Sequence, residues 1–239
     1  MFTREYHQAI AQVLYALDGK LLHEHHCLFG GGTVIALRYG EYRESVDVDF
    51  MVSSKAGYRD LRQLARNGLQ ALCRDNNLPF AQTREMRIDQ YGIRTMLSVV
   101  GRDIKFEIVL EGRVELEEPG PDDSVCGIAT LSPLDMATSK LLANADRCYD
   151  DGAFNRDVID LAMMKPSRSL LESAVIKAQA AYGNAILHDL AAAIERMETR
   201  DGWMERCMDA MAMDIPKAVL WKHIRALKKG LKLGHITRG

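Results

Sequence analysis

The sequence predicts an α+β protein, in which an N-terminal α/β domain with a mixed sheet precedes an all-helical C-terminal domain. Segments in which apolar and polar residues alternate, as in strands, occur only before about residue 130, among segments of helical period. Beyond that point nearly every segment has helical period and is rich in Ala, Leu and Met. The stretch 112–131 carries Gly112, Pro119, Gly120 and Pro121, which favour a loop. The domains are therefore expected at residues 1–130 and 131–239.

The N-terminal domain is expected to alternate between helices and strands. Apolar residues at helical spacing predict helices at residues 5–17 and 58–75, and residues 33–39 are expected to turn helical after a run of glycines. Residues 23–29 indicate a turn followed by a short buried strand. Alternation predicts further strands at residues 45–52, 84–89, 93–100 and 104–110, with turns at Gly92 and at residues 101–103.

The C-terminal domain has a clear helix start and a two-faced final helix. Ser132 suits the N-cap, Pro133 the first helical position and Asp135 the third. The final helix carries an apolar stripe of Leu220, Ile224, Leu227 and Leu231 beside a basic stripe of Lys222, Arg225, Lys229 and Lys232. Two interpretations stay open: an amphipathic helix packed on its own domain, or an arm that contacts RNA phosphates.

Composition excludes several classes of protein. The 239 residues are 47% hydrophobic and 27% charged, which is ordinary for a globular chain and unlike a disordered one. No stretch approaches the about 18 apolar residues of a membrane span, and the N-terminus lacks the pattern of a signal peptide. Five scattered cysteines fit neither a disulfide framework nor a zinc site, even beside the histidines at 23, 25 and 26. We therefore expect a cytoplasmic protein that does not associate with membranes.

Charge is unevenly distributed along the chain. The formal net charge is −2, but residues 215–239 contain seven basic residues and no acidic one. The rest of the chain has 24 basic against 33 acidic residues, a net charge of −9. A basic C-terminal segment on an acidic body indicates a polyanionic partner. The seven are Lys217, Lys222, Arg225, Lys228, Lys229, Lys232 and Arg238.

The strongest chemical signal is a pair of aspartates on one predicted strand. Asp47 and Asp49 alternate with Val46, Val48 and Phe50, so both carboxylates lie on the face opposite the apolar side chains. Two like charges this close repel one another, and a divalent cation relieves the repulsion. Mg²⁺ prefers hard oxygen ligands and often takes one or two carboxylates together with substrate phosphates. The pair therefore predicts a metal site.

A third carboxylate is expected from a later strand. In the segment 104–108 the apolar residues alternate inward, which leaves Lys105 and Glu107 on the other face. Glu107 is the best candidate for a third metal ligand, or for the group that orients or deprotonates an acceptor hydroxyl. The alternative is an ion pair with Lys105 or another base.

The run Gly30-Gly31-Gly32-Thr33 predicts a phosphate-binding loop. Glycines let the backbone approach a ligand, and a helix that starts at Thr33 favours an anion at its N-terminus. The loop is neither a Walker A motif, because no GK[ST] follows, nor a GxGxxG motif, because the next glycine is Gly40. Together with the acidic pair, it indicates in-line phosphoryl or nucleotidyl transfer. The alternative is a plain turn.

Residues 30–50, GGGTVIALRYGEYRESVDVDF, resemble a known signature. A Gly-Gly-Thr loop, a short helix and then Arg-x-Ser-x-Asp-hydrophobic-Asp are typical of the polymerase-β-type nucleotidyltransferase superfamily. The segment is similar, more narrowly, to the AbiEii/AbiGii-type nucleotidyltransferase toxins. In that family a third acid follows in a Lys-x-Asp context, which matches Lys105-Phe106-Glu107 with Glu in place of Asp.

The resemblance continues into the C-terminal domain. A helix with a Lys and an Arg matches Lys140 and Arg147, and an Arg-Asp…Asp-Leu element matches residues 156–161. The motifs occur in the family's order from residue 30 to about 164, while the last about 75 residues match only as helical. The spacing of Lys140 and Arg147 places them on one helical face, either as triphosphate ligands or as part of a solvated face. Asp157 is expected to position one of them, and Asp160 to pair with Arg156.

The resemblance implies a nucleotidyltransferase-type N-terminal domain and transfer of a nucleotide from an NTP, with Mg²⁺ or Mn²⁺ as cofactor. It implies metal ligation by Asp47, Asp49 and Glu107, and catalysis by these residues with Lys140. The nucleotide would be bound by Gly31, Gly32, Thr33, Arg43, Ser45, Lys140 and Arg147. For Arg43 a pair with a nearby acid, and for Ser45 a cap on the strand, are equally good interpretations.

The implied acceptor is RNA, such as a tRNA end, and the implied partner is a cognate antitoxin. Two alternatives stay open. The first is a transferase that modifies a small molecule such as an antibiotic. The second is a non-catalytic module that binds a nucleotide or a partner protein, an interpretation that the glutamate at position 107 favours.

Overall fold

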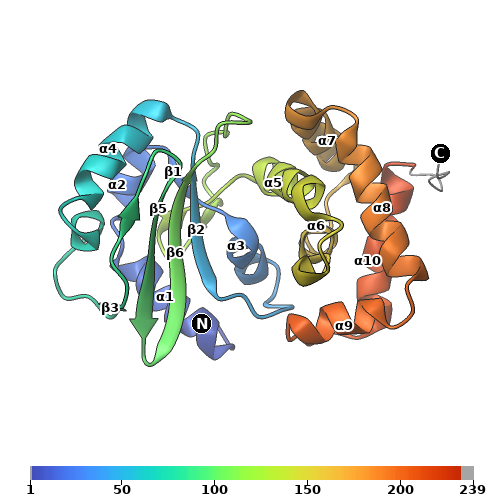
Figure 1. Cartoon of the computed structure of the whole chain (residues 1–239), viewed down its shortest axis with the longest axis horizontal. Coiled ribbons are helices and arrows are strands. Elements are labelled where there is room, and N and C mark those ends of the chain that lie inside the picture. The colour runs from blue at the N-terminus through green and yellow to red at the C-terminus, as the bar shows by residue number, and fades with distance from the viewer. Residues whose placement is uncertain (1, 233–239) are drawn as a thin grey trace. The chain divides into compact units, whose positions relative to one another are not determined.

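The computed structural model describes residues 2–232, and it divides the chain into two compact units. The sheet unit contains the chain up to Glu41 and Ser45–Ser132. The helical unit contains Tyr42–Glu44 and the chain from Pro133 on (Figure 1). The predicted α+β class is confirmed, since a mixed sheet occupies one unit and helices the other. Arg238, one of the seven basic residues of the C-terminal segment, lies outside the described residues.

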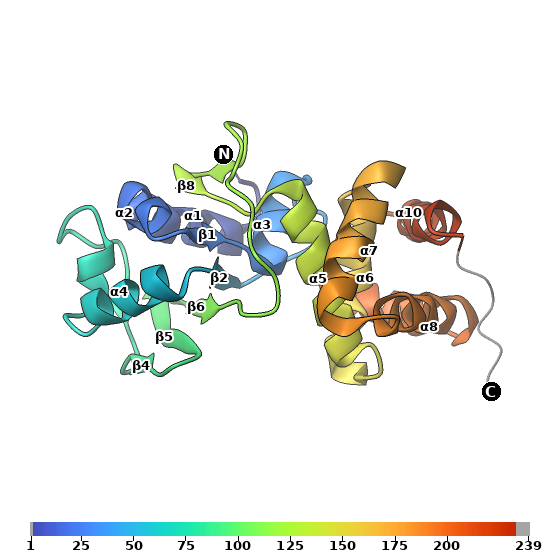
Figure 2. The same ribbon diagram turned by 90° about the horizontal axis from the view of Figure 1, so that it is seen from above.

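The sheet has six strands, and its central pair is parallel. The order is β1-β2-β6-β5-β3, with β4 also on β5. β2 and β6 run parallel, and the other pairs are antiparallel. Seen from above, β1, β2, β6 and β5 follow one another in this order (Figure 2). The bounds are β1 (Cys27–Phe29), β2 (Asp47–Val52), β3 (Ala81–Gln82), β4 (Arg87–Ile88), β5 (Gly92–Val99) and β6 (Arg102–Leu110).

Alternation explains why β2 and β6 form the centre of the sheet. On β2, Val48 and Phe50 are fully buried between half-buried neighbours, and on β6 Phe106 is fully buried. The ring of Phe50 lies 5.6 Å from that of Phe29 and 5.8 Å from that of Phe106, centroid to centroid. These contacts join β1, β2 and β6 through one apolar face. The other face of the central strands carries Asp47, Asp49, Lys105 and Glu107, followed by Met51 and Val109.

The remaining elements of the sheet unit are mostly helical. They are α1 (Glu5–Ala16), α2 (Gly19–Glu24), α3 (Gly31–Arg38), α4 (Lys55–Ala65), the 3₁₀ turn Leu69–Leu72, and the two-stranded pair β7 (Ser124–Val125) and β8 (Ile128–Ala129). The predicted helix 58–75 ends early because Gly68 has φ +98°, a conformation that no helix continues through. α2 was not predicted, although Asp18 caps it by accepting hydrogen bonds from the N–H groups of Lys20 and Leu21.

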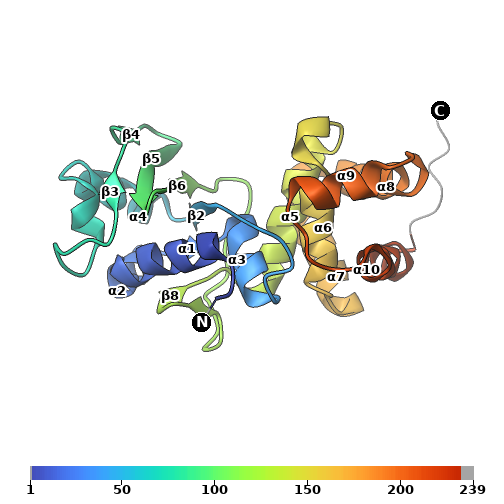
Figure 3. The ribbon, with the colours of Figure 1, turned by 90° about the horizontal axis from the view of Figure 1, so that it is seen from below.

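The helical unit begins where the sequence predicts, at Pro133. Its helices are α5 (Pro133–Arg147), α6 (Arg156–Met163), α7 (Arg168–Tyr182), α8 (Ala185–Thr199), α9 (Trp203–Ala210) and α10 (Lys217–Gly230), with a 3₁₀ turn at Asp151–Ala153. α5 packs against α6, α7 and α8 (Figures 1 and 3). Trp203, fully buried, donates its indole N–H to Asn155 at 2.6 Å and stacks with Phe154.

Tyr42–Glu44 joins the helical unit although its neighbours in sequence belong to the sheet unit. The N–H of Glu44 donates to the carbonyl of Met211 at 2.9 Å, and the N–H of Asp214 donates to the carbonyl of Tyr42 at 3.3 Å. A single boundary at residue 130, as predicted from the sequence, therefore does not account for these three residues.

Two global features bear on the class of protein. All five cysteines are free thiols, as their scattered spacing predicts. Within residues 2–232, none of the helices is long and apolar enough to cross a membrane.

Candidate active site

The parallel pairing of β2 and β6 brings the predicted acids together on one face of the sheet. Asp47 lies opposite Lys105, and Asp49 lies opposite Glu107. Because side chains alternate along a strand, these four side chains share the face that the buried apolar residues do not use. Asp47 and Asp49 are half-buried, and Glu107 is buried. The predicted convergence of three carboxylates from two strands is therefore seen in the backbone register.

The glycine turn packs directly on Asp49. The N–H of Gly30 donates to the carbonyl of Asp49 at 2.8 Å. Gly31 has φ +71°, and a Cβ atom placed there would lie 2.6 Å from Oδ2 of Asp49. Only glycine allows this approach. α3 begins at Gly31, two residues earlier than predicted, so the N-terminal N–H groups of that helix come from the glycines.

Thr33 and Ser45 are buried, and their hydroxyls bond to each other and to the backbone. Thr33 Oγ1 donates to the carbonyl of Asp47 at 2.5 Å, which uses its one proton. Ser45 Oγ, 2.7 Å away, must therefore donate to Thr33 Oγ1. Both hydroxyls thus fix the start of β2. For Ser45 this is the cap on the strand that the sequence left open beside phosphate binding, and for Thr33 the role in phosphate binding stays a prediction.

His7 supports this arrangement and was not predicted. The N–H of Ser45 donates to its Nε2 at 3.1 Å, so Nε2 is unprotonated and Nδ1 carries the proton that bonds to Glu41 at 2.8 Å. Burial raises the pKa of Glu41, but hydrogen bonds from Thr3, Arg4 and His7 outweigh it and lower the pKa to about 2. No sequence signal marked His7, because its two partners lie more than thirty residues away along the chain.

Glu107 is held between two basic side chains. Its carboxylate is paired with Lys105 on the same strand and with Arg94, which lies opposite it on β5. Burial raises the pKa of Glu107, but the hydrogen bonds and charges of Lys105 and Arg94 outweigh it and lower the pKa. Nη1 of Arg94 also lies 3.3 Å from the carboxylate of Asp89. The ion pair weighed for Glu107 from the sequence is thus present in the structure.

Lys105 is close to all three predicted acids. Burial lowers the pKa of its ammonium, but the hydrogen bond to Glu107 and the charges of Asp49, Glu107 and Asp47 raise it. Within residues 2–232, no three His, Cys, Asp or Glu residues are arranged to hold a metal ion. The two aspartates still fit Mg²⁺ or Mn²⁺, because these ions take one or two carboxylates and complete their coordination with water and phosphate oxygens.

The helical unit gathers a second group of predicted residues. Lys140 is buried, and its Nζ lies 2.7 Å from Oδ2 of Asp160 and 3.2 Å from Oδ1 of Asp157. Arg147 is one-third exposed and binds Asp157 through two hydrogen bonds, Nε to Oδ2 at 2.6 Å and Nη2 to Oδ1 at 2.9 Å. Asp157 therefore positions both Lys140 and Arg147, where the sequence predicted one of them.

Asp160 is the centre of this cluster. Arg43 binds it through two hydrogen bonds of 2.7 and 3.0 Å, and the hydroxyl of Tyr42 donates to it at 2.6 Å. Arg156, predicted as its partner, is exposed, and Asp160 is paired with Arg43 and Lys140 instead. Burial raises the pKa of Asp160, but the charges of Arg43 and Lys140 outweigh it and hold the pKa well below its ordinary value.

The positive charge of this cluster is most accessible at Arg147, whose side chain is 34% exposed. Arg43 and Lys140 are buried against the carboxylates of Asp157 and Asp160. The hydrogen bond to Asp157 and the charges of Asp157, Asp160 and Asp146 all act on Arg147 and raise its pKa.

Two solved structures with TM-scores above 0.5 show the same fold, and a third structure is similar at a lower score. A proposed nucleotidyltransferase from H. pylori is 14% identical and covers 97% of both chains, with a TM-score of 0.52. JHP933 from Helicobacter pylori is 15% identical and covers 97% of this chain and 95% of its own, with a TM-score of 0.53. MenT4, a nucleotidyltransferase toxin from Mycobacterium tuberculosis, is 16% identical and covers 97% and 92%, with a TM-score of 0.48.

The sequence comparisons give the family. A search of curated proteins finds no match. The family model described as nucleotidyl transferase AbiEii toxin, type IV toxin–antitoxin system, matches residues 12–227, which is most of the chain. The match extends beyond the segment that carries the recognised motifs and includes most of the helical unit. The chain therefore belongs to the AbiEii family of nucleotidyltransferase toxins.

Proposed function

We propose that this nucleotidyltransferase transfers a nucleotide from an NTP to RNA, such as a tRNA end, in a reaction that depends on Mg²⁺ or Mn²⁺. The observation that carries the proposal is the packing of the glycine turn on Asp49, with Asp47 on the same face of β2. This packing supports the proposal, because the carboxylates assigned to the metal lie beside the N–H groups assigned to phosphate. The family implies an antitoxin partner as well as the nucleotide substrate.

The sheet unit supplies the reaction centre in this proposal. Asp47 and Asp49 would hold the metal, which would supply positive charge to stabilise the transition state of phosphoryl transfer. The N–H groups of Gly31 and Gly32 at the start of α3 bind phosphate oxygens. Glu107 is proposed as the third acid, and Lys105 and Arg94 keep it ionised.

The helical unit supplies positive charge for the triphosphate. We assign this role to Lys140 and Arg147, because Asp157 holds both cations in one cluster and the Arg147 side chain is one-third exposed. Arg43 and Asp157 act as positioning residues, since each binds a charged partner within the cluster.

The transfer step breaks one bond and forms one. An acceptor hydroxyl oxygen attacks the α-phosphorus, and the bond from that phosphorus to the bridging oxygen of the β-phosphate breaks. Pyrophosphate leaves with the bonding electron pair. The hydroxyl proton passes to a carboxylate, for which we assign Glu107.

The test uses each labelled NTP with Mg²⁺ and total RNA. Wild type and D103N, which changes an exposed aspartate on β6, are expected to label RNA, whereas D49N labels none. Label that enters a small-molecule product would favour the antibiotic-modifying alternative. If wild type labels nothing with any NTP, the proposed transfer is wrong and the non-catalytic alternative is favoured.

A further inference from the structure

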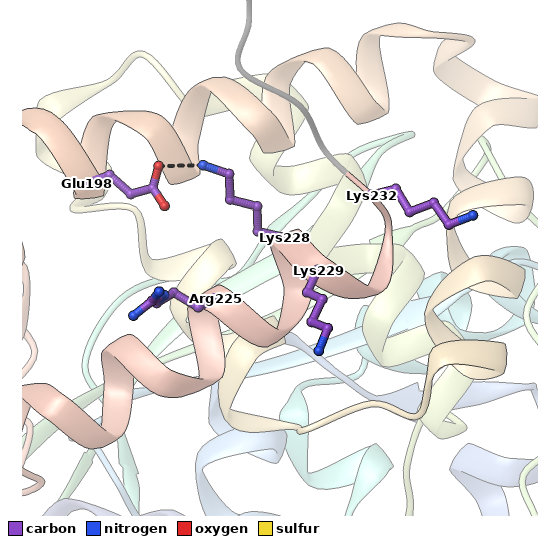
Figure 4. A pocket seen from close by; sticks show the side chains of 5 residues that line it. All are labelled: Glu198, Arg225, Lys228, Lys229 and Lys232. Carbon is purple, nitrogen blue, oxygen red and sulfur yellow. Dashed lines mark hydrogen bonds and ion pairs between the residues drawn. The ribbon is translucent and has the colours of Figure 1, made fainter.

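A basic hollow on the helical unit lies between α8 and the end of α10. It has a volume of about 460 Å³ and is lined by Glu198, Arg225, Lys228, Lys229 and Lys232. Four of these side chains are cationic, and Figure 4 shows that they come from α10 and the residues just after it. We call this surface the basic hollow.

Among the residues that the structure describes, Lys228 is the one cation of the hollow whose charge a carboxylate neutralises. Lys228 Nζ lies 2.7 Å from the carboxylate of Glu198, the dashed contact in Figure 4. Arg225, Lys229 and Lys232 are exposed. The hollow therefore presents a net charge of three positive units, in a chain whose formal net charge is −2. A surface with this much positive charge, on a chain of negative net charge, attracts polyanions.

The cations are spaced closely enough to meet several negative charges of one strand. Arg225, Lys228 and Lys229 lie three and four residues apart in α10, and Lys232 follows the end of the helix with φ +51°. Four residues of helix rise about 6 Å, and a nucleic-acid strand carries a charge roughly every 3.4 Å along its axis. Several phosphates of one strand can therefore meet these side chains at once.

The apolar side of α10 argues against a lipid surface as the partner. Leu220, Ile224 and Leu227 are buried, and α10 packs against α6, α8 and α9. A helix that binds at a membrane interface needs its apolar face free to enter the acyl region. The hollow itself is lined by charged side chains alone.

We propose that the basic hollow docks the sugar–phosphate backbone of the acceptor RNA without reading its sequence. This inference rests on the proposed function for the identity of the polyanion. The lysine ammonium groups act as point charges, and the Arg225 guanidinium can bind a phosphate through two hydrogen bonds. Binding of this kind depends strongly on salt concentration, because each contact releases a condensed counterion.

The test measures binding of the full chain to a fluorescein-labelled structured RNA by fluorescence polarisation, without nucleotide and over a range of salt concentrations. The variant R225E/K229E/K232E reverses three charges of the hollow. The control K55E/R59E/R66E makes the same change in net charge on exposed positions at α4. Circular dichroism checks that each variant is folded, and R225Q/K229Q/K232Q replaces the reversal variant if it is not.

We expect the hollow variant to bind RNA at least about tenfold more weakly than wild type at about 0.1 M salt, and the control to bind like wild type. The slope of the logarithm of the RNA association constant against the logarithm of the salt concentration should fall in magnitude by about 2, because three phosphate contacts are lost. An equal loss in the control, or no loss in the hollow variant, overturns the proposal. Binding to phosphatidylserine vesicles is measured in parallel. The proposal is also overturned if the hollow variant binds these vesicles more weakly than wild type but binds RNA like wild type.

D49N separates this proposal from the proposed function. Its hollow is intact, so it should bind RNA like wild type while transferring no nucleotide. RNA binding that depends on the hollow, in a protein that labels nothing with any NTP, would contradict the proposed function alone. Transfer to RNA whose KM is unchanged in the hollow variant would contradict the docking proposal alone, because the loss of docking should raise KM and leave kcat near its original value.

Discussion

At the scale of the residue, the absence of a side chain at Gly31 leaves space for the carboxylate of Asp49. A Cβ atom at this position would lie 2.6 Å from Oδ2 of Asp49, and φ is +71°. We expect G31A to lose most of its transferase activity, because the added methyl displaces the Asp49 carboxylate. The measurement is nucleotidyl transfer alongside urea unfolding.

Gly101 offers a matched control for this substitution. It has φ +76°, and no other atom lies within 4 Å of a Cβ placed there. G31A and G101A should therefore both lose about 1 kcal/mol of stability from backbone strain. Only G31A should lose activity as well, and equal activities would contradict the assigned role of the glycine turn.

The residues of the site differ in how readily the sequence predicts them. Asp47 and Asp49 share one strand, so alternation alone places them on one face. The pairing of Glu107 with Arg94 depends on the register of β5 with β6, and the bonds of His7 depend on tertiary packing. Contacts of this kind leave no periodic signal in the sequence.

At the scale of the element, most helices and strands of the sheet unit were predictable, and β3 was not. α1, β2, β5, β6 and the start of α5 lie close to where apolar periodicity and the Pro133 signal place them. β4 lies within the strand predicted at residues 84–89 but has two residues. β3 also has two residues and is held by pairing with β5, so too few residues carry the alternation.

The cluster joining α5, α6 and Tyr42–Glu44 depends most on Asp160. D160N would leave Arg43 and Lys140 buried without this carboxylate, and breaking a buried ion pair from one side costs about 3–5 kcal/mol. Urea unfolding should show a loss of this size. E172Q, which removes the exposed pair with Arg168 on α7, should cost no more than about 0.5 kcal/mol. Similar losses for the two variants would contradict this account.

At the scale of the whole molecule, acid should destabilise the fold. The pKa values of Glu41, Glu107, Asp157 and Asp160 are all lowered in the folded state, since partners outweigh burial at each. An acid with a lowered pKa contributes stability above its unfolded pKa, and this stability is lost as the pH falls towards the folded value. The free energy of unfolding should therefore decrease as the pH falls below about 4, the ordinary pKa range of these acids.

Glu41 gives the clearest window for this prediction. Its pKa falls from about 4.3 in an unfolded chain to about 2, so its contribution should disappear between these pH values. The urea midpoint of E41Q, followed from pH 6 to pH 2, should fall less steeply than that of wild type. Parallel curves would show that Glu41 is not linked to folding.

The division into units was only partly visible in the sequence. The change from mixed to helical periodicity marks the boundary near Pro133. The membership of Tyr42–Glu44 in the helical unit depends on partners at Asp160 and Met211, more than a hundred residues later. No local propensity records such a partnership.

The assignment of Tyr42–Glu44 to the helical unit affects how the protein can be divided into fragments and how it folds during synthesis. Neither unit is one uninterrupted stretch of chain. A fragment that starts at residue 133 would contain Asp160 but lack Arg43, and so would bury a carboxylate short of one counter-charge. During synthesis Arg43 is made 117 residues before Asp160. The ion pair between them therefore cannot form until α6 has been synthesised.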